Sequence, residues 1–140
     1  MDKTIMGSIE VTEKGWLHIR LDTLLPHCRY GSATQISDAI HDLRKGFTET
    51  LPYYETALLV IDEYCLPDSR CVYDQDNKAW KAIPNALKGH FFPDDDQFTL
   101  SICLLSKPSK DTACHIYLMP PEDAYEFFGK RFGLDSRCPQ

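Results

Sequence analysis

The sequence predicts an α/β fold of the α+β kind, a single mixed-sheet domain that covers residues 1–140. Three kinds of pattern lead to this prediction. Alternation of apolar and polar residues marks strands, apolar residues at spacings of three and four mark helices, and one continuous apolar run marks a strand buried on both faces. The patterns follow the order β-β-α-β-α-β-β-α, so we expect helices packed on one sheet.

The first two strands are expected on either side of a tight turn at residues 12–15. Apolar and polar residues alternate across residues 9–11 and again across residues 17–21. Gly15 can adopt the positive φ that such turns often require. This segment therefore predicts a β-hairpin.

A helix is expected over residues 32–47. Ser32 and Gln35 form a capping-box pattern, in which each side chain bonds a free backbone N–H group of the first turn. Apolar residues follow at helical spacing, namely Ile36, Ile40, Leu43 and Phe47. The next element, residues 57–61, is an uninterrupted apolar run, which predicts a strand in the centre of the sheet.

A second helix is indicated by the apolar residues Trp80, Ile83 and Leu87. Pro84 complicates this helix, because a proline beyond the first turn removes a backbone hydrogen bond and clashes with the preceding turn. Two possibilities follow. Either the helix kinks at Pro84, or a short turn precedes a helix that begins near Ile83.

The last third of the chain predicts two strands and a helix. Residues 98–106 alternate between apolar and polar side chains, and residues 113–119 form a second apolar run. Residues 107–111 between them are typical of a hairpin connection, so we expect the two strands to pair. A short helix is expected from Pro121, because proline is favoured at the first helical position.

Charge and hydropathy limit the possible functions. The net charge of −6 counts against a non-specific binder of polyanions, since Lys and Arg dominate phosphate binding. Residues 70–110 are different, because they hold six of the fifteen basic residues and five of the twenty-one acidic ones. No apolar run is long enough for a membrane span, and no N-terminal targeting pattern is visible, so a cytoplasmic protein is expected.

Two acidic motifs are the candidate functional residues. Asp74-Gln-Asp-Asn77 precedes the second predicted helix, and Asp94-Asp-Asp-Gln97 follows it. Hard divalent cations prefer oxygen ligands, so such a pair of motifs could hold a metal for phosphodiester chemistry. The alternative is that Asp76 caps the helix while Asp74 and the second motif are solvated loop residues.

A polar stripe on the second predicted helix could contact phosphates. The stripe consists of Lys78, Lys81, Asn85 and Lys88, at spacings of three, four and three. An amphipathic helix also has a solvated face of this kind without any binding role. The pattern leaves both interpretations open.

These motifs resemble the RusA-type Holliday junction resolvases, a family of small dimeric endonucleases of phages and mobile elements. The resemblance rests on Asp74-Gln-Asp-Asn77, Asn85-Ala-Leu-Lys-Gly89, Asp94-Asp-Asp-Gln97 and Ser106-Lys107. It covers roughly residues 32–119 and is one of pattern rather than of close identity.

The resemblance implies a Mg²⁺-dependent or Mn²⁺-dependent homodimeric endonuclease that cleaves branched DNA. Asp74, Asp76 and Asp95 would bind the metal, and Lys81 would contact the scissile phosphate, with Lys78 as the other candidate lysine. The residues expected to contact DNA are Arg70, Lys78, Lys81, Lys88 and Lys107.

The chain also departs from the family pattern. Its candidate lysines stand two and five residues after Asp76, whereas the family lysine stands four residues after the second aspartate. The basic run before the first aspartate is reduced to Arg70. The second hypothesis is therefore a non-enzymatic RusA-like relative, a module of a mobile element that binds a protein or nucleic acid.

Overall fold

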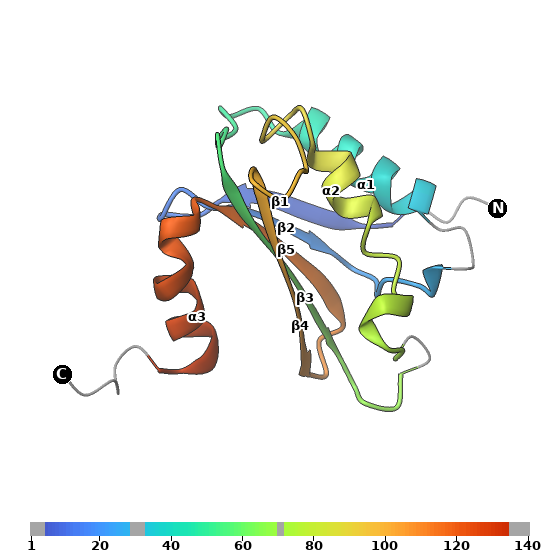
Figure 1. Ribbon diagram of the computed structural model, residues 1–140. Helices are drawn as coiled ribbons and strands as arrows, with labels where there is room; N and C mark the ends of the chain where they lie inside the picture. The colour runs from blue at the N-terminus through green and yellow to red at the C-terminus, as the bar shows by residue number, and fades with distance from the viewer. Residues whose placement is uncertain (1–4, 29–32, 70–71, 135–140) are drawn as a thin grey trace.

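The computed structural model describes residues 5–28, 33–69 and 72–134, which form one five-stranded sheet between two helical layers (Figure 1). Helices α1 and α2 lie together on one face, and α3 lies on the other. Two short 3₁₀ helices are labelled η. In chain order the elements are β1 (Gly7–Val11), β2 (Leu17–Leu21), α1 (Ala33–Gly46), β3 (Ala57–Cys65), η2 (Gln75–Asn77), α2 (Ala82–Leu87), β4 (Leu100–Pro108), β5 (Ala113–Met119), η3 (Pro121–Asp123) and α3 (Ala124–Phe132).

This architecture confirms the predicted fold class, a mixed sheet in an α+β domain. The strand order is β1-β2-β5-β3-β4. Strands β1, β2, β5 and β3 pair with their neighbours in antiparallel fashion, and β4 is parallel to β3. Within the described residues, no helix has the length and apolarity needed to cross a membrane.

The predicted pairing of residues 98–106 with residues 113–119 is wrong. Strand β5 pairs with β2 and β3, and β4 pairs with the outer side of β3. The two strands are close in sequence, but β5 passes between β2 and β3, where both of its edges are hydrogen-bonded. The loop of residues 109–112 therefore crosses β3 instead of closing a hairpin.

The first hairpin and the first helix agree with their predictions. Val11 pairs with Leu17, and Gly15 in the turn between them has φ of +83°, the left-handed conformation that favours glycine. Helix α1 packs Ile36 and Ile40 against the sheet. Ser32, the expected capping residue, lies outside the described residues.

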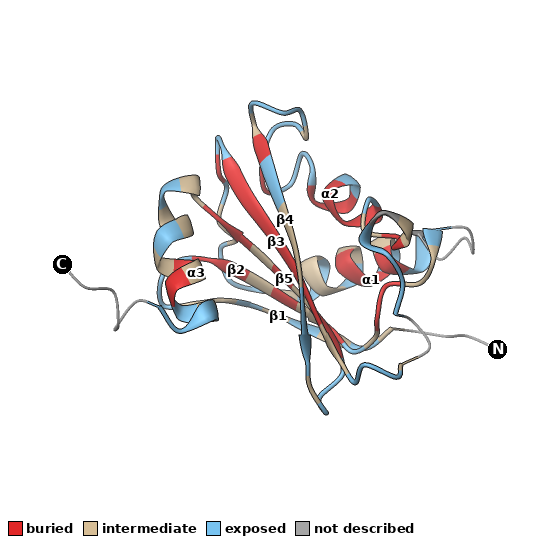
Figure 2. Ribbon diagram, turned by 60° about the horizontal axis from the view of Figure 1, so that its bottom comes forward, coloured by how far each residue is buried: buried red, intermediate tan, exposed pale blue. Residues whose placement is uncertain are grey.

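Strand β3 is longer than the apolar run that predicted it. It continues through Asp62 and Glu63, both buried, to Cys65. Its side chains alternate between two hydrophobic clusters: Leu59 packs towards α1 and α2, and Val60 packs with Phe127 of α3 on the other face. In Figure 2, β3 is red along most of its length, whereas the edge strand β4 beside it is mostly tan and pale blue.

Pro84 is accommodated by the second of the two predicted arrangements. A turn at residues 80–81 precedes α2, and Pro84 is the third residue of the helix. In the first turn its missing N–H group has no helical acceptor to bond, so the proline costs no hydrogen bond there. Helix α2 is consequently only six residues long.

Candidate functional site

The first acidic motif lies just beyond the carboxyl end of β3. Its backbone forms the 3₁₀ helix η2 instead of the extended segment that would align Asp74 and Asp76. Asp74 is exposed at the N-cap of η2 and makes no side-chain capping hydrogen bond. Asp76 contributes its backbone to η2, while its side chain lies outside the described part of the structure.

The second acidic motif lies before β4. The Lys88 ammonium is 3.4 Å from the Asp95 carboxylate, and both side chains are substantially exposed. The Asp96 carboxylate accepts hydrogen bonds from the backbone N–H groups of Phe98 and Thr99, which lower its pKa. These contacts make the motif a turn that leads into a strand.

The structure does not bring Asp74 and Asp95 together. Lys78, just after η2, contacts Glu63 near the carboxyl end of β3, whereas Thr99 bonds to Ala57 at its amino end. Ala57 and Glu63 are six residue steps apart along β3, about 20 Å at 3.3 Å per residue. Among the side chains that the structure describes, which do not include that of Asp76, no three His, Cys, Asp or Glu residues lie close enough to hold a metal ion. Binding of Mg²⁺ stays a prediction.

The predicted lysine stripe is not a single helical face. Helix α2 begins only after Lys81, so Lys81 is its exposed N-cap, and Lys88 is its C-cap. Lys78 lies before the turn and is buried, with a relative exposure of 5%. Lys107 extends over the Tyr64 ring, 5.7 Å from its centroid. Arg70 lies outside the described residues.

A buried ion pair joins Lys78 to Glu63. The Lys78 Nζ and Glu63 Oε2 atoms are 3.1 Å apart, and their side chains are 4% and 7% exposed. Glu63 Oε2 also accepts a hydrogen bond of 2.7 Å from the Leu25 backbone N–H. Removing either charge from such a pair leaves the other buried and uncompensated, which is strongly unfavourable.

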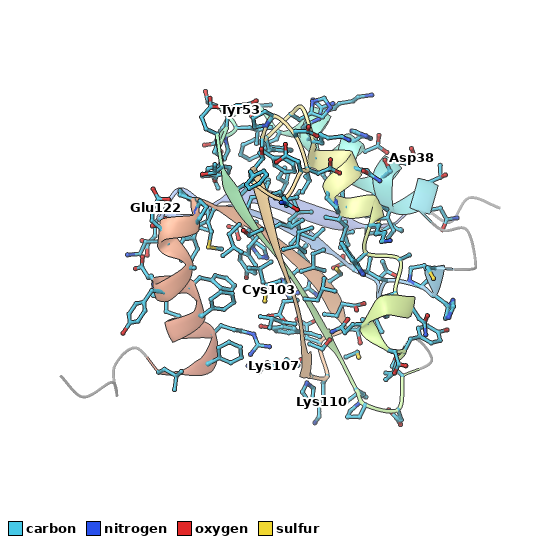
Figure 3. All side chains as sticks on the ribbon, viewed as in Figure 1. Asp38, Tyr53, Cys103, Lys107, Lys110 and Glu122 are labelled. Atoms are coloured by element: carbon cyan, nitrogen blue, oxygen red, sulfur yellow. The ribbon has the colours of Figure 1, made fainter. Side chains whose placement is uncertain are left out.

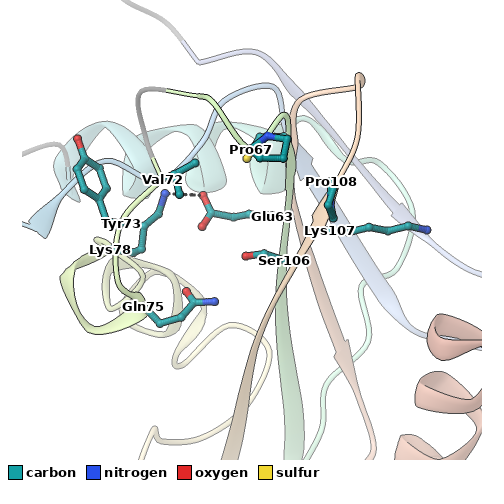
Figure 4. A pocket seen from close by; sticks show the side chains of 10 residues that line it. Glu63, Pro67, Val72, Tyr73, Gln75, Lys78, Ser106, Lys107 and Pro108 are labelled. Atoms are coloured by element: carbon teal, nitrogen blue, oxygen red, sulfur yellow. Dashed lines mark ion pairs between the residues drawn. The ribbon is translucent and has the colours of Figure 1, made fainter.

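A cavity of about 230 Å³ opens beside this ion pair, at the carboxyl ends of the parallel strands β3 and β4. We call it the β3–β4 pocket. The side chains of Gln75 and Ser106 point into the space between η2 and β4, whereas Lys107 points away from it (Figure 4). The lining residues used below are Glu63, Val72, Tyr73, Gln75, Lys78 and Ser106.

The rim of the β3–β4 pocket is apolar and exposed. Val72 is 53% exposed and Tyr73 is 36% exposed, and both line the pocket. The Lys78 ammonium lies 5.5 Å from the centroid of the Tyr73 ring, a cation–π distance. The pocket therefore combines apolar walls with a few polar groups, which is the usual composition of a binding site.

Cys114 lies opposite Glu63 in the neighbouring strand β5. Its thiol is fully buried, and this burial, followed by the negative charge of Glu63, raises its pKa well above the ordinary value. A thiol that stays protonated is a poor nucleophile. The Cys114 side chain therefore acts as a small apolar residue in the core.

Sequence reasoning missed Glu63, the acid that anchors the pocket. The available signal was Asp62-Glu63 directly after the apolar run, because acids that continue a buried strand need partners. Those partners come from distant segments. Glu63 pairs with Lys78, while Asp62 faces the other side of the sheet and accepts a hydrogen bond of 2.6 Å from Arg131 of α3.

Comparison with protein-family models places the chain in a family. A model described as a family of unknown function (DUF6100) matches residues 1–131. The chain belongs to DUF6100. No curated protein matches it. The DUF6100 match assigns no activity, and the resemblance to RusA-type resolvases stays a prediction.

Proposed function

We infer that this DUF6100 chain is a non-enzymatic binding module that recognises a protein partner at the β3–β4 pocket. The observation that supports this function best is the cavity itself, which has a buried ion pair at its base and exposed apolar residues at its rim. Exposed apolar side chains beside a cavity are typical of interaction sites.

The size and chemistry of the pocket favour one inserted side chain. A volume of about 230 Å³ is below the usual range for drug-sized ligands and suits a single amino-acid side chain. Val72 and Tyr73 offer apolar contact, and Gln75 and Ser106 offer hydrogen bonds. A partner residue with an apolar stem and a polar end fits these groups.

The charge of the chain supports a protein partner over a nucleic acid. The net charge is −6, and the Lys78 charge next to the pocket faces the Glu63 carboxylate. Phosphate binding depends on an excess of positive charge. A partner that buries apolar surface at the rim needs no such excess.

A random peptide library displayed on phage tests this function. Peptides selected on the wild-type chain should bind the Val72→Glu variant at least about tenfold more weakly, because the new carboxylate would be desolvated at the rim. The matched control is Phe98→Glu, which places the same charge at a residue that is 84% exposed and lies at the amino end of β4. Selection without any binder, or equal binding by Val72→Glu, contradicts the proposal.

The second candidate is the metal-dependent endonuclease of branched DNA, as a homodimer of a mobile element. One observation favours it: the segment with Asp74 and Asp76 lies next to a pocket that contains Lys78. Incubation of the chain with a labelled four-way junction and Mg²⁺ tests this function. Cleavage that is lost in Asp76→Asn supports the endonuclease, and absence of cleavage rejects it.

A further inference from the structure

Strand β4 is an edge of the sheet. It follows β3 at the end of the strand order, and no strand in the described part of the chain pairs with its outer side. It is nine residues long, whereas the opposite edge strand, β1, has five. The one charged residue of β4 is Lys107, next to its last residue. Long edge strands with few charges are templates for pairing with another chain.

The hydrogen bonds of β4 show which backbone groups face outwards. Ala57 donates its N–H to Thr99, and Ser109 donates to Cys65, so the odd-numbered residues of β4 bond to β3. The even-numbered residues therefore direct their N–H and C=O groups to the outer edge. Leu100 donates to Asp96, and Pro108 has no N–H. The outward donors left are Ile102, Leu104 and Ser106.

These donors are spaced symmetrically about Leu104. In an antiparallel pair of two β4 strands, Leu104 can lie opposite its own copy, and Ile102 can lie opposite Ser106. Every outward N–H of the three residues then has a C=O partner. The Ser106 C=O already accepts a hydrogen bond of 3.3 Å from Arg131 of its own chain, so it would accept the Ile102 N–H of the other copy with its second lone pair. If the register shifted by one residue, each residue whose N–H and C=O groups face the other copy would lie opposite a residue whose groups face its own β3. These hydrogen bonds would then be lost.

The side chains of β4 suit this arrangement on both faces. Ile102 is 39% exposed on the side of α1 and α2, and Leu104 is half-buried there. Cys103 and Leu105 are half-buried on the side of α3. A second β4 strand would extend both apolar layers, because Cys103 of one copy would lie opposite Leu105 of the other.

Charges at the two ends of β4 are complementary. Asp94, Asp95 and Asp96 precede the strand, while Lys107 and Lys110 lie at its far end (Figure 3). Antiparallel pairing brings the acidic end of one copy to the basic end of the other. Two such contacts form per dimer, whereas a parallel arrangement would place like charges together.

We propose that two copies of this chain associate through β4 in antiparallel register, centred on Leu104, to form a continuous ten-stranded sheet. The partner is thus a second copy of the chain. The interface adjoins the β3–β4 pocket at Ser106, which would pair through its backbone and which also lines the pocket. Backbone hydrogen bonds fix the register, and the apolar side chains and the charged residues at the two ends of β4 contribute to the affinity.

Sedimentation equilibrium of the full chain tests this dimer. We expect a species of twice the 16.1 kDa chain mass. Ile102→Lys should raise the dissociation constant by about tenfold or more, because each dimer would contain two such lysines at its apolar edge. Ser8→Lys on β1 is the control and should leave the dimer unchanged. A monomer at all concentrations, or a dimer that Ile102→Lys does not weaken, overturns the proposal.

Salt dependence tests the charge contacts separately. The wild-type dimer should weaken as salt is added, and the Lys107→Glu/Lys110→Glu dimer should be weaker at low salt and strengthen with added salt. The variant Lys45→Glu/Lys81→Glu carries the same change in net charge at exposed sites away from β4. If the two double variants form dimers with the same salt dependence, the proposed contacts between the charged ends of β4 are contradicted.

Disulfide trapping tests the register in folded protein. In a chain with Cys28, Cys71 and Cys138 changed to Ser, Leu105→Cys should form a covalent dimer through Cys103 of the partner copy when diamide removes the two thiol hydrogens. Ser101→Cys is the matched control, because it would lie opposite Lys107. No covalent dimer from Leu105→Cys, or equal yields from both variants, overturns the register.

Discussion

The two ends of the β3–β4 strand pair place acidic and lysine residues in opposite environments. At the carboxyl ends, Glu63 and Lys78 form an ion pair with side chains 7% and 4% exposed. At the amino ends, Asp95 and Lys88 face each other with side chains 31% and 41% exposed. Similar residue types thus form a buried anchor at one end and a solvated turn at the other. Burial therefore decides whether such a pair has a structural role.

We expect the strongest loss of stability from a substitution at the buried end. Lys78→Met leaves the Glu63 carboxylate buried without its ammonium partner, and we expect a loss of roughly 3–5 kcal/mol in the free energy of unfolding. Urea denaturation measures this change.

A double variant distinguishes a missing partner from a packing defect. In Glu63→Leu/Lys78→Met no charge is left buried, so the double variant should regain much of the stability that Lys78→Met loses. If the double variant is less stable than both single variants, the loss arises from packing instead of charge.

Substitution of Asp96, at the solvated end, is expected to cause a smaller loss of stability. Hydrogen bonds from the Phe98 and Thr99 N–H groups hold its pKa below 3.8. Its contribution to stability is therefore complete above pH 3.8 and is lost as the pH falls through the folded-state pKa. Asp96→Ala should destabilise the chain less than Lys78→Met does.

The test for Asp96 is acid dependence measured by thermal unfolding. The difference in melting temperature between wild type and Asp96→Ala should be constant at neutral pH and should narrow below pH 3.8. Gln97→Ala, an exposed neighbour, is the control. If the difference in melting temperature instead widens in acid, the lowered pKa of Asp96 is contradicted.

The smallest effect is expected from Lys88. Exposed ion pairs contribute little because water and salt screen them, so Lys88→Met should change the free energy of unfolding by about 0.5 kcal/mol or less. The same urea denaturation measures it. If Lys88→Met lowers the free energy of unfolding as much as Lys78→Met does, the two ion pairs do not differ in their contribution to stability.

Elements set by local patterns were predictable. The alternation around Gly15, the helical spacing from Ile36 and the apolar run at residues 57–61 each correspond to an observed element. The pairing between strands was harder to predict from the sequence. Strand β5 lies between β2 and β3, and a local pattern carries no information about such long-range neighbours. The hairpin-like loop of residues 107–111 was therefore misleading.

The candidate site was predicted only in part, because an assumption about helix geometry was wrong. Two motifs that flank a helix were expected to hold one metal together. The segment from Lys78 to Lys88, with α2 in it, instead runs along β3 from its carboxyl end to its amino end. Asp74 and Asp95 consequently separate, and the pocket forms around Glu63, whose partner is fifteen residues away in the sequence.

Amide chemical-shift mapping of the tightest library peptide tests the binding site most directly. The largest changes should fall on residues 63–67, 72–78 and 106–108, around the β3–β4 pocket. Changes centred on residues 94–99 or on α3 would contradict it.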